Sequence, residues 1–106
     1  MVIVLHRQIQ IIDPEKWDEL EEINKKFDEL EKQIGFPDTK KRWRAVFGTH
    51  HLNTHIVEFV WESMAKLEKT MVKALINPEY QKLQEEIAPI IKKNYWEIYT
   101  PLPLPF

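Results

Sequence analysis

Three of the four histidines of this 106-residue chain lie in the stretch GTHHLNTH, at His50, His51 and His55. Histidine binds metals readily, but zinc and iron sites generally use at least three protein ligands. If Asn53 and Thr54 form a tight hairpin turn, strand alternation places His50 and His55 on one face and His51 on the other. No carboxylate shares that face nearby. His50 and His55 are therefore weak metal candidates, and we predict no functional metal site.

A helix is the alternative backbone for this histidine stretch. It would place His51 and His55 four residues apart on one face, as in metalloprotease motifs. The sequence that follows, IVEFV, is typical of a strand, and the glutamate that makes such a helix catalytic is missing. A strand is the favoured prediction.

Ionisable side chains also lie in the middle of the first predicted strand. Alternation places Arg7 with the apolar residues of one face, and His6 with Gln8 on the other. Such residues are unusual in a central strand. In a structural interpretation, His6 is a core histidine bonded to a neighbour and Arg7 pairs with Glu58 or Glu97. In a functional interpretation, they belong to a binding pocket.

The elements that must position these residues follow from the hydrophobic period. Alternating β-branched runs predict strands, and apolar residues at three- and four-residue spacing predict helices. The predicted strands cover residues 2–12, 41–49, 55–62 and 95–100. One long helix follows the first strand, and two helices lie between the third and the fourth.

Residues with strong positional preferences mark the ends of these helices. Asp13, followed by Pro14, is predicted to cap the long helix, and Gly35 to end it. Ser63 and Asn77 are predicted to cap the second and third helices.

The resulting order, βαββαβ, predicts an α+β ferredoxin-like fold: a four-stranded antiparallel sheet with its helices on one face. Residues 1–100 are predicted to form one domain, and residues 101–106 a proline-rich tail. Both faces of the strands carry large apolar side chains, whereas a solvated face should be polar at every second residue. We therefore predict a homodimer formed by sheet-to-sheet packing.

Composition excludes several classes of function. A net charge of -2 without a basic stripe argues against nucleic acid as a partner. The absence of cysteine excludes disulfides, thiolate nucleophiles and sulfur-ligated zinc. No apolar run approaches the roughly 20 residues that span a membrane, so we expect a cytoplasmic protein without membrane contact. Abundant lysine and glutamate suit a thermophile with surface ion pairs.

The runs FVWES (residues 59–63) and NPEY (residues 77–80) resemble a pattern of NIPSNAP-like proteins: a strand-end tryptophan, a serine-capped helix and Asp-Pro-Glu-Trp. The opening HRQIQI (residues 6–11), leading into Asp13-Pro14, is similar to the first strand of that family. It is also similar to that of the antibiotic-biosynthesis monooxygenases, which share the dimeric α/β-barrel superfamily. The resemblance covers nearly the whole chain and implies a fold and a dimer.

The resemblance also implies a place for a ligand. In monooxygenases and haem-degrading members of the superfamily, the cavity lies between helices and sheet and contains a polar residue of the first strand. His6 matches that residue, and Gln8 would share the cavity. Trp61 and Tyr80 could form its walls, although such aromatic side chains also suit a core. The ligand-binding candidates are thus His6, Gln8, Trp61 and Tyr80.

One departure from the haem-degrading pattern matters. Those relatives bind iron through a histidine of the second helix, and this chain has no histidine between Ser63 and Lys93. We therefore predict no cofactor. The function expected is at most binding of a small molecule between sheet and helices.

The alternative is a cofactor-independent, monooxygenase-like enzyme acting on a small aromatic or electron-rich substrate. The candidate catalytic residues are His6 as the base and Arg7 or Arg44 as the cation that stabilises the anion. The sequence leaves open whether the chain is an enzyme.

Overall fold

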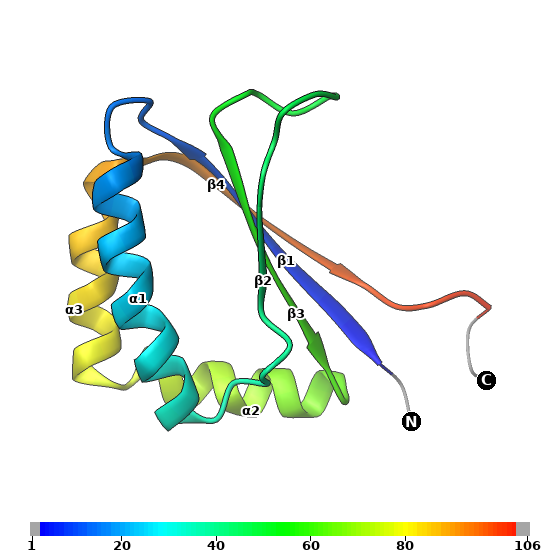
Figure 1. Cartoon of the computed structure of the whole chain (residues 1–106). Coiled ribbons are helices and arrows are strands. Elements are labelled where there is room, and N and C mark those ends of the chain that lie inside the picture. The colour runs from blue at the N-terminus through cyan, green and yellow to red at the C-terminus, as the bar shows by residue number, and fades with distance from the viewer. Residues whose placement is uncertain (1–2, 104–106) are drawn as a thin grey trace.

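Within residues 3–103, which the computed structural model describes, the chain folds into four strands and three α-helices (Figure 1). The elements are β1 (Val4–Ile12), α1 (Trp17–Ile34), β2 (Lys41–Arg44), β3 (Thr54–Trp61), α2 (Met64–Leu75), α3 (Pro78–Ile87), a 3₁₀ helix (Ala88–Ile90) and β4 (Ile91–Tyr99). This order confirms the predicted ferredoxin-like α+β fold. None of the helices in this range is long and apolar enough to cross a membrane.

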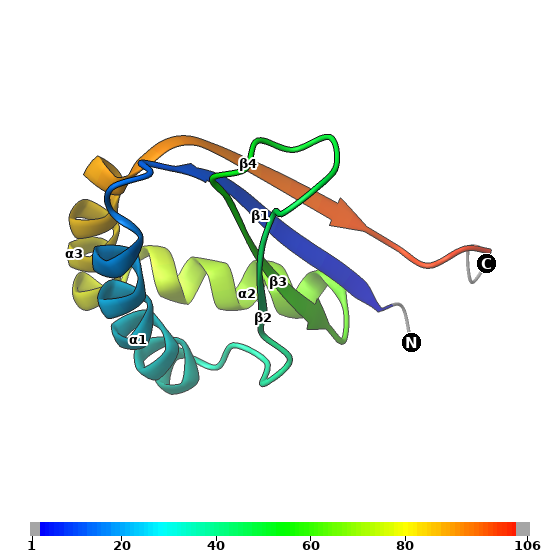
Figure 2. The same cartoon turned by 45° about the horizontal axis from the view of Figure 1, so that its top comes forward.

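The four strands form one antiparallel sheet in the order β2-β3-β1-β4. The register pairs His6 of β1 with Phe59 of β3, and Gln10 of β1 with His55 of β3 and Asn94 of β4. Paired residues of neighbouring strands point to the same face, so these side chains share one side of the sheet. The helices lie on one side of the sheet (Figure 2). We call the other side the open face.

Two apolar clusters join the helices to the sheet and show which face they cover. In one, Val4 of β1 packs with Leu67 of α2, which places the even-numbered residues of β1 on the helix side. The rest of that cluster is Val57, Phe59 and Trp61. The other cluster joins α1 and α3 to the far end of the sheet through Ile12, Leu20, Phe27, Leu30, Ala74, Tyr80, Leu83, Ile87 and Ile90.

Most helix ends lie where their capping residues predict. Ser63 Oγ accepts from Lys66 N at 3.1 Å, and Asn77 Oδ1 accepts from the first turn of α3. Gly35 ends α1 with a φ of 114°, in the left-handed region that favours glycine. The predicted Asp13 cap is wrong. Asp13 Oδ1 accepts from Glu15 N at 3.1 Å in a turn, and α1 begins later, at Trp17.

The predicted tight hairpin is also wrong. β2 ends at Arg44, and the bond from Ala45 N to Thr54 O, at 3.0 Å, closes the β2–β3 pairing. Asn53 cannot lie at a hairpin tip, because its backbone oxygen accepts from Ile12 N at 2.8 Å. Its side chain accepts from Trp17 Nε1 at 3.2 Å. Tertiary hydrogen bonds thus hold Asn53 at the β1–α1 junction, and a longer loop joins β2 to β3.

The bounds of the elements at the two ends of the chain differ less from the predicted bounds. β4 begins at Ile91, not at residue 95, because Ile91 pairs with Ile12 after a register shift that leaves Lys92 of β4 as an extra residue. Of the predicted proline-rich tail, residues 104–106 lie outside the described residues, as does the start of the first predicted strand at residue 2.

Candidate functional site

A cavity of about 50 Å³, which we call the chamber, lies between the sheet and helices α1 and α3. All four strands or their flanking residues reach it, and most of its lining is polar. Its polar residues are Gln8, Gln10, Asn24, Glu31, Lys40, His55, Tyr80, Gln84 and Asn94. This volume holds one or two water molecules or the polar end of a larger ligand.

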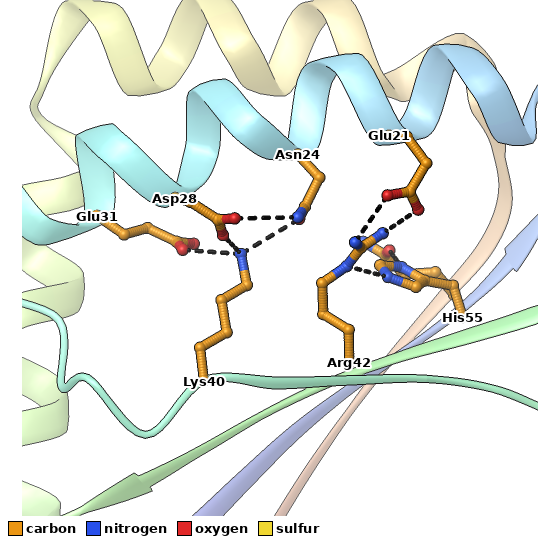
Figure 3. Close-up of polar contacts among 8 residues, drawn as sticks. Glu21, Asn24, Asp28, Glu31, Lys40, Arg42 and His55 are labelled. Carbon is orange, nitrogen blue, oxygen red and sulfur yellow. Dashed lines mark hydrogen bonds and ion pairs between the residues drawn. The ribbon is translucent and has the colours of Figure 1, made fainter.

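His55, on the chamber wall, is bonded at both ring nitrogens (Figure 3). Arg42 Nε donates to His55 Nε2 at 2.9 Å, and His55 Nδ1 lies 2.8 Å from Gln10 Oε1. Arg42 also makes a two-pronged ion pair with Glu21 of α1, at 2.7 and 3.0 Å. Burial, and next the charge of Arg42, lower the pKa of His55 to about 4. Its imidazole is therefore uncharged at neutral pH.

A second polar cluster lies beside the first (Figure 3). Lys40 Nζ lies on the α1 side, where it donates to Asn24 Oδ1 at 3.2 Å, to Glu31 Oε1 at 2.9 Å and to Asp28 Oδ1. These three acceptors lie on one face of α1 because they are separated by four and three residues. Burial raises the pKa of Glu31, and the Lys40 ammonium opposes that shift. The ammonium thus neutralises the carboxylate that borders the chamber.

A larger groove, of about 620 Å³, adjoins the chamber between α2, α3 and the sheet. Its walls include the apolar side chains of Leu67, Met71, Val72, Leu75 and Trp96. Four residues line both spaces, and we call them the collar: Gln8, Tyr80, Gln84 and Asn94. Burial, and next the Glu31 charge, raise the pKa of Tyr80 to about 12, so its hydroxyl stays protonated. The collar therefore consists of uncharged hydrogen-bonding groups.

Of the predicted ligand-binding residues, Gln8 and Tyr80 come together in the collar, whereas His6 and Trp61 lie elsewhere. His6 stacks on Trp96 at 4.5 Å between ring centroids, with Phe59 at 6.1 Å. Within residues 3–103 neither ring nitrogen of His6 has a hydrogen-bond partner, and burial lowers its pKa to about 4. Trp61 is buried in the cluster under α2 and borders neither the chamber nor the groove.

The two candidate catalytic arginines lie apart from the chamber and from each other. Arg7 points to the open face between Glu58 and Glu97, with nitrogen–oxygen distances of 3.8 and 4.0 Å. The predicted pairing of Arg7 with these glutamates is thereby confirmed. Arg44 lies with its guanidinium 4.1 Å from the ring centroid of Trp17, at the start of α1.

The histidine stretch does not form one cluster. His50 and His51 are exposed in the loop between β2 and β3, whereas His55 is buried on β3. The predicted placement of His50 and His55 on one face is wrong, because the hairpin lacks the tight turn on which it rested. In the described part of the chain, no group of three or more histidine or acidic side chains is placed to hold a metal.

Sequence reasoning missed most of the polar network around the chamber. Two signals were present. Gln10 follows His6 and Gln8 on the same strand face, and Asn24 and Glu31 are polar residues that share the buried side of α1 with Phe27. A polar residue inside an apolar stripe indicates a partner within the fold.

Comparison with known proteins places the fold. No protein-family model and no curated protein matches this chain. A NIPSNAP family protein from Agrobacterium tumefaciens is similar in structure, with a TM-score of 0.78 at 13% identity over 96% of this chain and 88% of that one. A NIPSNAP-like domain protein from Burkholderia xenovorans gives 0.76 at 15% identity, covering 96% and 87%. This chain shares the NIPSNAP fold.

The likeness extends to a second group of proteins. A candidate antibiotic biosynthesis monooxygenase from Nitrosomonas europaea has a TM-score of 0.71 at 8% identity, covering 95% of this chain and 91% of that one. Both groups match the resemblance inferred from the sequence. At these identities the NIPSNAP-like fold is shared, and the activity has to be argued from the site.

Proposed function

We propose that this protein binds a small organic molecule between the sheet and the helices. The observation that carries the proposal is the collar, because Gln8, Tyr80, Gln84 and Asn94 line both the apolar groove and the polar chamber. A ligand with an apolar body and a polar end would fill both spaces. Binding sites commonly combine apolar walls with a few placed polar groups in this way.

A groove-filling variant tests this proposal directly. Val72 lines the groove from α2 and is 58% exposed, so Val72→Trp should block the groove without disturbing the core. Ile76, at the end of α2 and 72% exposed, borders neither space and supplies the control Ile76→Trp. With the bicyclic ketone 1-indanone as probe, calorimetric titration should show at least about tenfold weaker binding for the first variant only. Equal affinities would remove the groove from the site.

We also infer that two copies pack open face against open face. Large apolar side chains of this face are about half exposed: Ile3, Trp43, Val60, Tyr95 and Tyr99. Clusters of exposed apolar groups on a folded chain are typical of an interface. A two-fold axis would bring the same face of each copy together.

Light scattering coupled to size exclusion tests the dimer at micromolar concentration. Val60→Lys places a charge among the apolar side chains of the open face and should yield monomers. Ile76→Lys, an equally drastic change on the helix side, should leave the dimer intact. A wild-type chain that elutes as a folded 12.8 kDa monomer contradicts the inference.

A monooxygenase-like activity is the second candidate, supported by His6, which is neutral, buried and without a hydrogen-bond partner in residues 3–103. As a base it would accept the phenolic proton of a substrate such as 1-naphthol. Dioxygen would then convert 1-naphthol to 1,4-naphthoquinone and water, which balances all atoms. This reaction requires Trp96 to swing away, because its ring covers His6 at 4.5 Å. Oxygen uptake that is lost in His6→Leu would support it, and no uptake by the wild-type protein would exclude it for this substrate.

A further inference from the structure

The hydrogen bonds around His55 determine which way the Gln10 side chain faces. An arginine Nε–H can only donate, so the bond of 2.9 Å from Arg42 requires a lone pair on His55 Nε2. A neutral imidazole carries one N–H, which must then lie on Nδ1. The atom of Gln10 at 2.8 Å from Nδ1 must consequently be the acceptor, Oε1.

This orientation leaves the amide nitrogen of Gln10 free. Within residues 3–103 no hydrogen bond uses Gln10 Nε2, although the residue is only 4% exposed and lines the chamber. Gln10 Nε2 is not one of the fully buried atoms that lack a partner among the described residues, so water or a ligand in the chamber can reach it and accept from it. Gln10 therefore offers the chamber two donor hydrogens whose direction the protein has fixed.

The charged donor of the chamber, Lys40, is already used. The Lys40 ammonium has three hydrogens and three acceptors, on Asn24, Asp28 and Glu31. Its charge is balanced by the two carboxylates, at 43% and 10% side-chain exposure. An anionic ligand group would have to displace these partners, whereas an uncharged oxygen would not.

We propose that Gln10 selects the ligand. The series of hydrogen bonds from Glu21 through Arg42 and His55 fixes the direction of the Gln10 amide. Its nitrogen donates to an uncharged acceptor oxygen, such as a ketone, quinone or amide carbonyl. Glu21, Arg42 and His55 are positioning residues, since they act on the ligand through Gln10. This inference rests on the proposed function of the groove and chamber and adds the chemistry of the ligand's polar end.

The histidine tautomer tests the orientation without any ligand. In protein labelled with 15N-histidine, the nitrogen spectrum should show His55 protonated on Nδ1 and unprotonated on Nε2 at pH 7. A His55→Gln variant identifies the signals. A proton on Nε2 in the wild-type protein would overturn the proposal, because Gln10 would then have to present its nitrogen to the histidine and its oxygen to the chamber.

A pair of ligands of the same shape tests the selectivity. 1-Indanone carries one carbonyl oxygen, and indane is the same ring system without it. We expect 1-indanone to bind the wild-type protein roughly five- to tenfold more tightly than indane, the range of one well-placed hydrogen bond. The preference should vanish in Arg42→Met, where the tautomer is no longer fixed and the amide can turn. It should persist in Arg42→Lys, which still donates to His55.

The outcomes separate this inference from the proposed function. If both compounds bind the wild-type protein equally, the groove binds ligands but Gln10 does not select them, and the inference fails alone. If neither compound binds, the proposed function fails for these rings, and the carbonyl preference fails with it. A carbonyl preference that survives in Arg42→Met would show that the hydrogen bonds of Glu21, Arg42 and His55 do not fix the direction of the Gln10 amide.

Discussion

Two buried histidines lie on the same face of the sheet, and the protein treats them in opposite ways. His55 is 3% exposed and His6 is 4% exposed, and burial lowers the pKa of each to about 4. His55 has a partner at each ring nitrogen. In the described residues His6 has none and is held by stacking on Trp96 and Phe59.

The difference separates two properties of a buried histidine that are often treated together: the charge of its ring and the direction in which the ring points. Removal from water sets the charge of both rings, because it disfavours the protonated form whatever the neighbours are. Partners alone decide the direction of a ring and of the groups bonded to it. The hydrogen bond from His55 therefore fixes the direction of the Gln10 side chain. His6 is equally buried but fixes no neighbour in this way.

The largest expected effect concerns acid. In the unfolded chain both histidines take up a proton near pH 6.5, while in the folded protein they do so only near pH 4. The contribution of the two neutral histidines to the free energy of unfolding is therefore fully present above pH 6.5. It falls as the pH drops towards 4, by about 3 kcal/mol for each histidine. Urea unfolding at pH 7 and pH 4.5 measures this loss.

Two features of the chain frame the acid experiment. The exposed His50 supplies the control, because replacing it by glutamine should leave the loss unchanged. Glu31 acts in the opposite direction, since burial raises its pKa and the folded protein accepts that proton more readily. Equal stability at the two pH values would mean that neither histidine is desolvated as the fold indicates.

The second prediction compares matched substitutions at pH 7. His55→Leu leaves Arg42 Nε and Gln10 Oε1 buried without their partner, and should lower the free energy of unfolding by about 2 to 4 kcal/mol. His6→Leu removes no hydrogen bond, so its effect should stay within about 1 kcal/mol. His6→Leu should also remove about half of the loss in acid. Similar losses for the two variants would erase the distinction between the histidines.

The same contrast explains how far the sequence could predict this molecule. The order of the elements along the chain, the three helices and the common face of His6 and Gln8 follow from periodicity, which depends on local spacing alone. That this face meets the helices was implied by the family resemblance. Gly35, Ser63 and Asn77 end or begin helices as expected because a cap is a contact within one turn.

Features set by distant contacts could not be predicted in this way. The sequence predicts that Asn53 lies in a hairpin turn, but in the structure Asn53 is held by hydrogen bonds with Trp17 and Ile12. Arg42 reaches His55 because β2 pairs Arg42 with Val57 and Arg44 with His55, a register that depends on the true length of the loop. The candidate site was therefore predicted at Gln8 and Tyr80, and missed where strand pairing decides, at Gln10 and His55.

The third prediction concerns Lys40. Like the ring nitrogens of His55, all three of its ammonium hydrogens have hydrogen-bond partners. Lys40→Met leaves Glu31 buried at 10% side-chain exposure without its cation and should cost about 1 to 3 kcal/mol of stability at pH 8. The loss should shrink at pH 5, because removal of the ammonium allows burial to raise the pKa of Glu31 further, and protonation then relieves the unpaired charge. The neighbouring exposed Lys41→Met is the control. A loss independent of pH would show that Glu31 is not the group left unpaired.

The smallest expected change in stability comes from uncovering His6. Trp96 is 47% exposed, so Trp96→Leu should lower the free energy of unfolding by only about 1 kcal/mol. Its ring nevertheless covers His6 at 4.5 Å, and without it water should reach the imidazole. The pKa of His6 should then rise from about 4 towards 6.5, while that of His55 stays near 4.

A nuclear magnetic resonance titration of both histidines reads out this difference in a single sample. Tyr95→Leu is the control, since Tyr95 is the preceding residue of β4, is 49% exposed and lies on the open face. An unchanged His6 pKa in Trp96→Leu would assign the desolvation to Phe59 and the side chains of α2. The two histidines would then differ in their partners but not in how readily water can reach them.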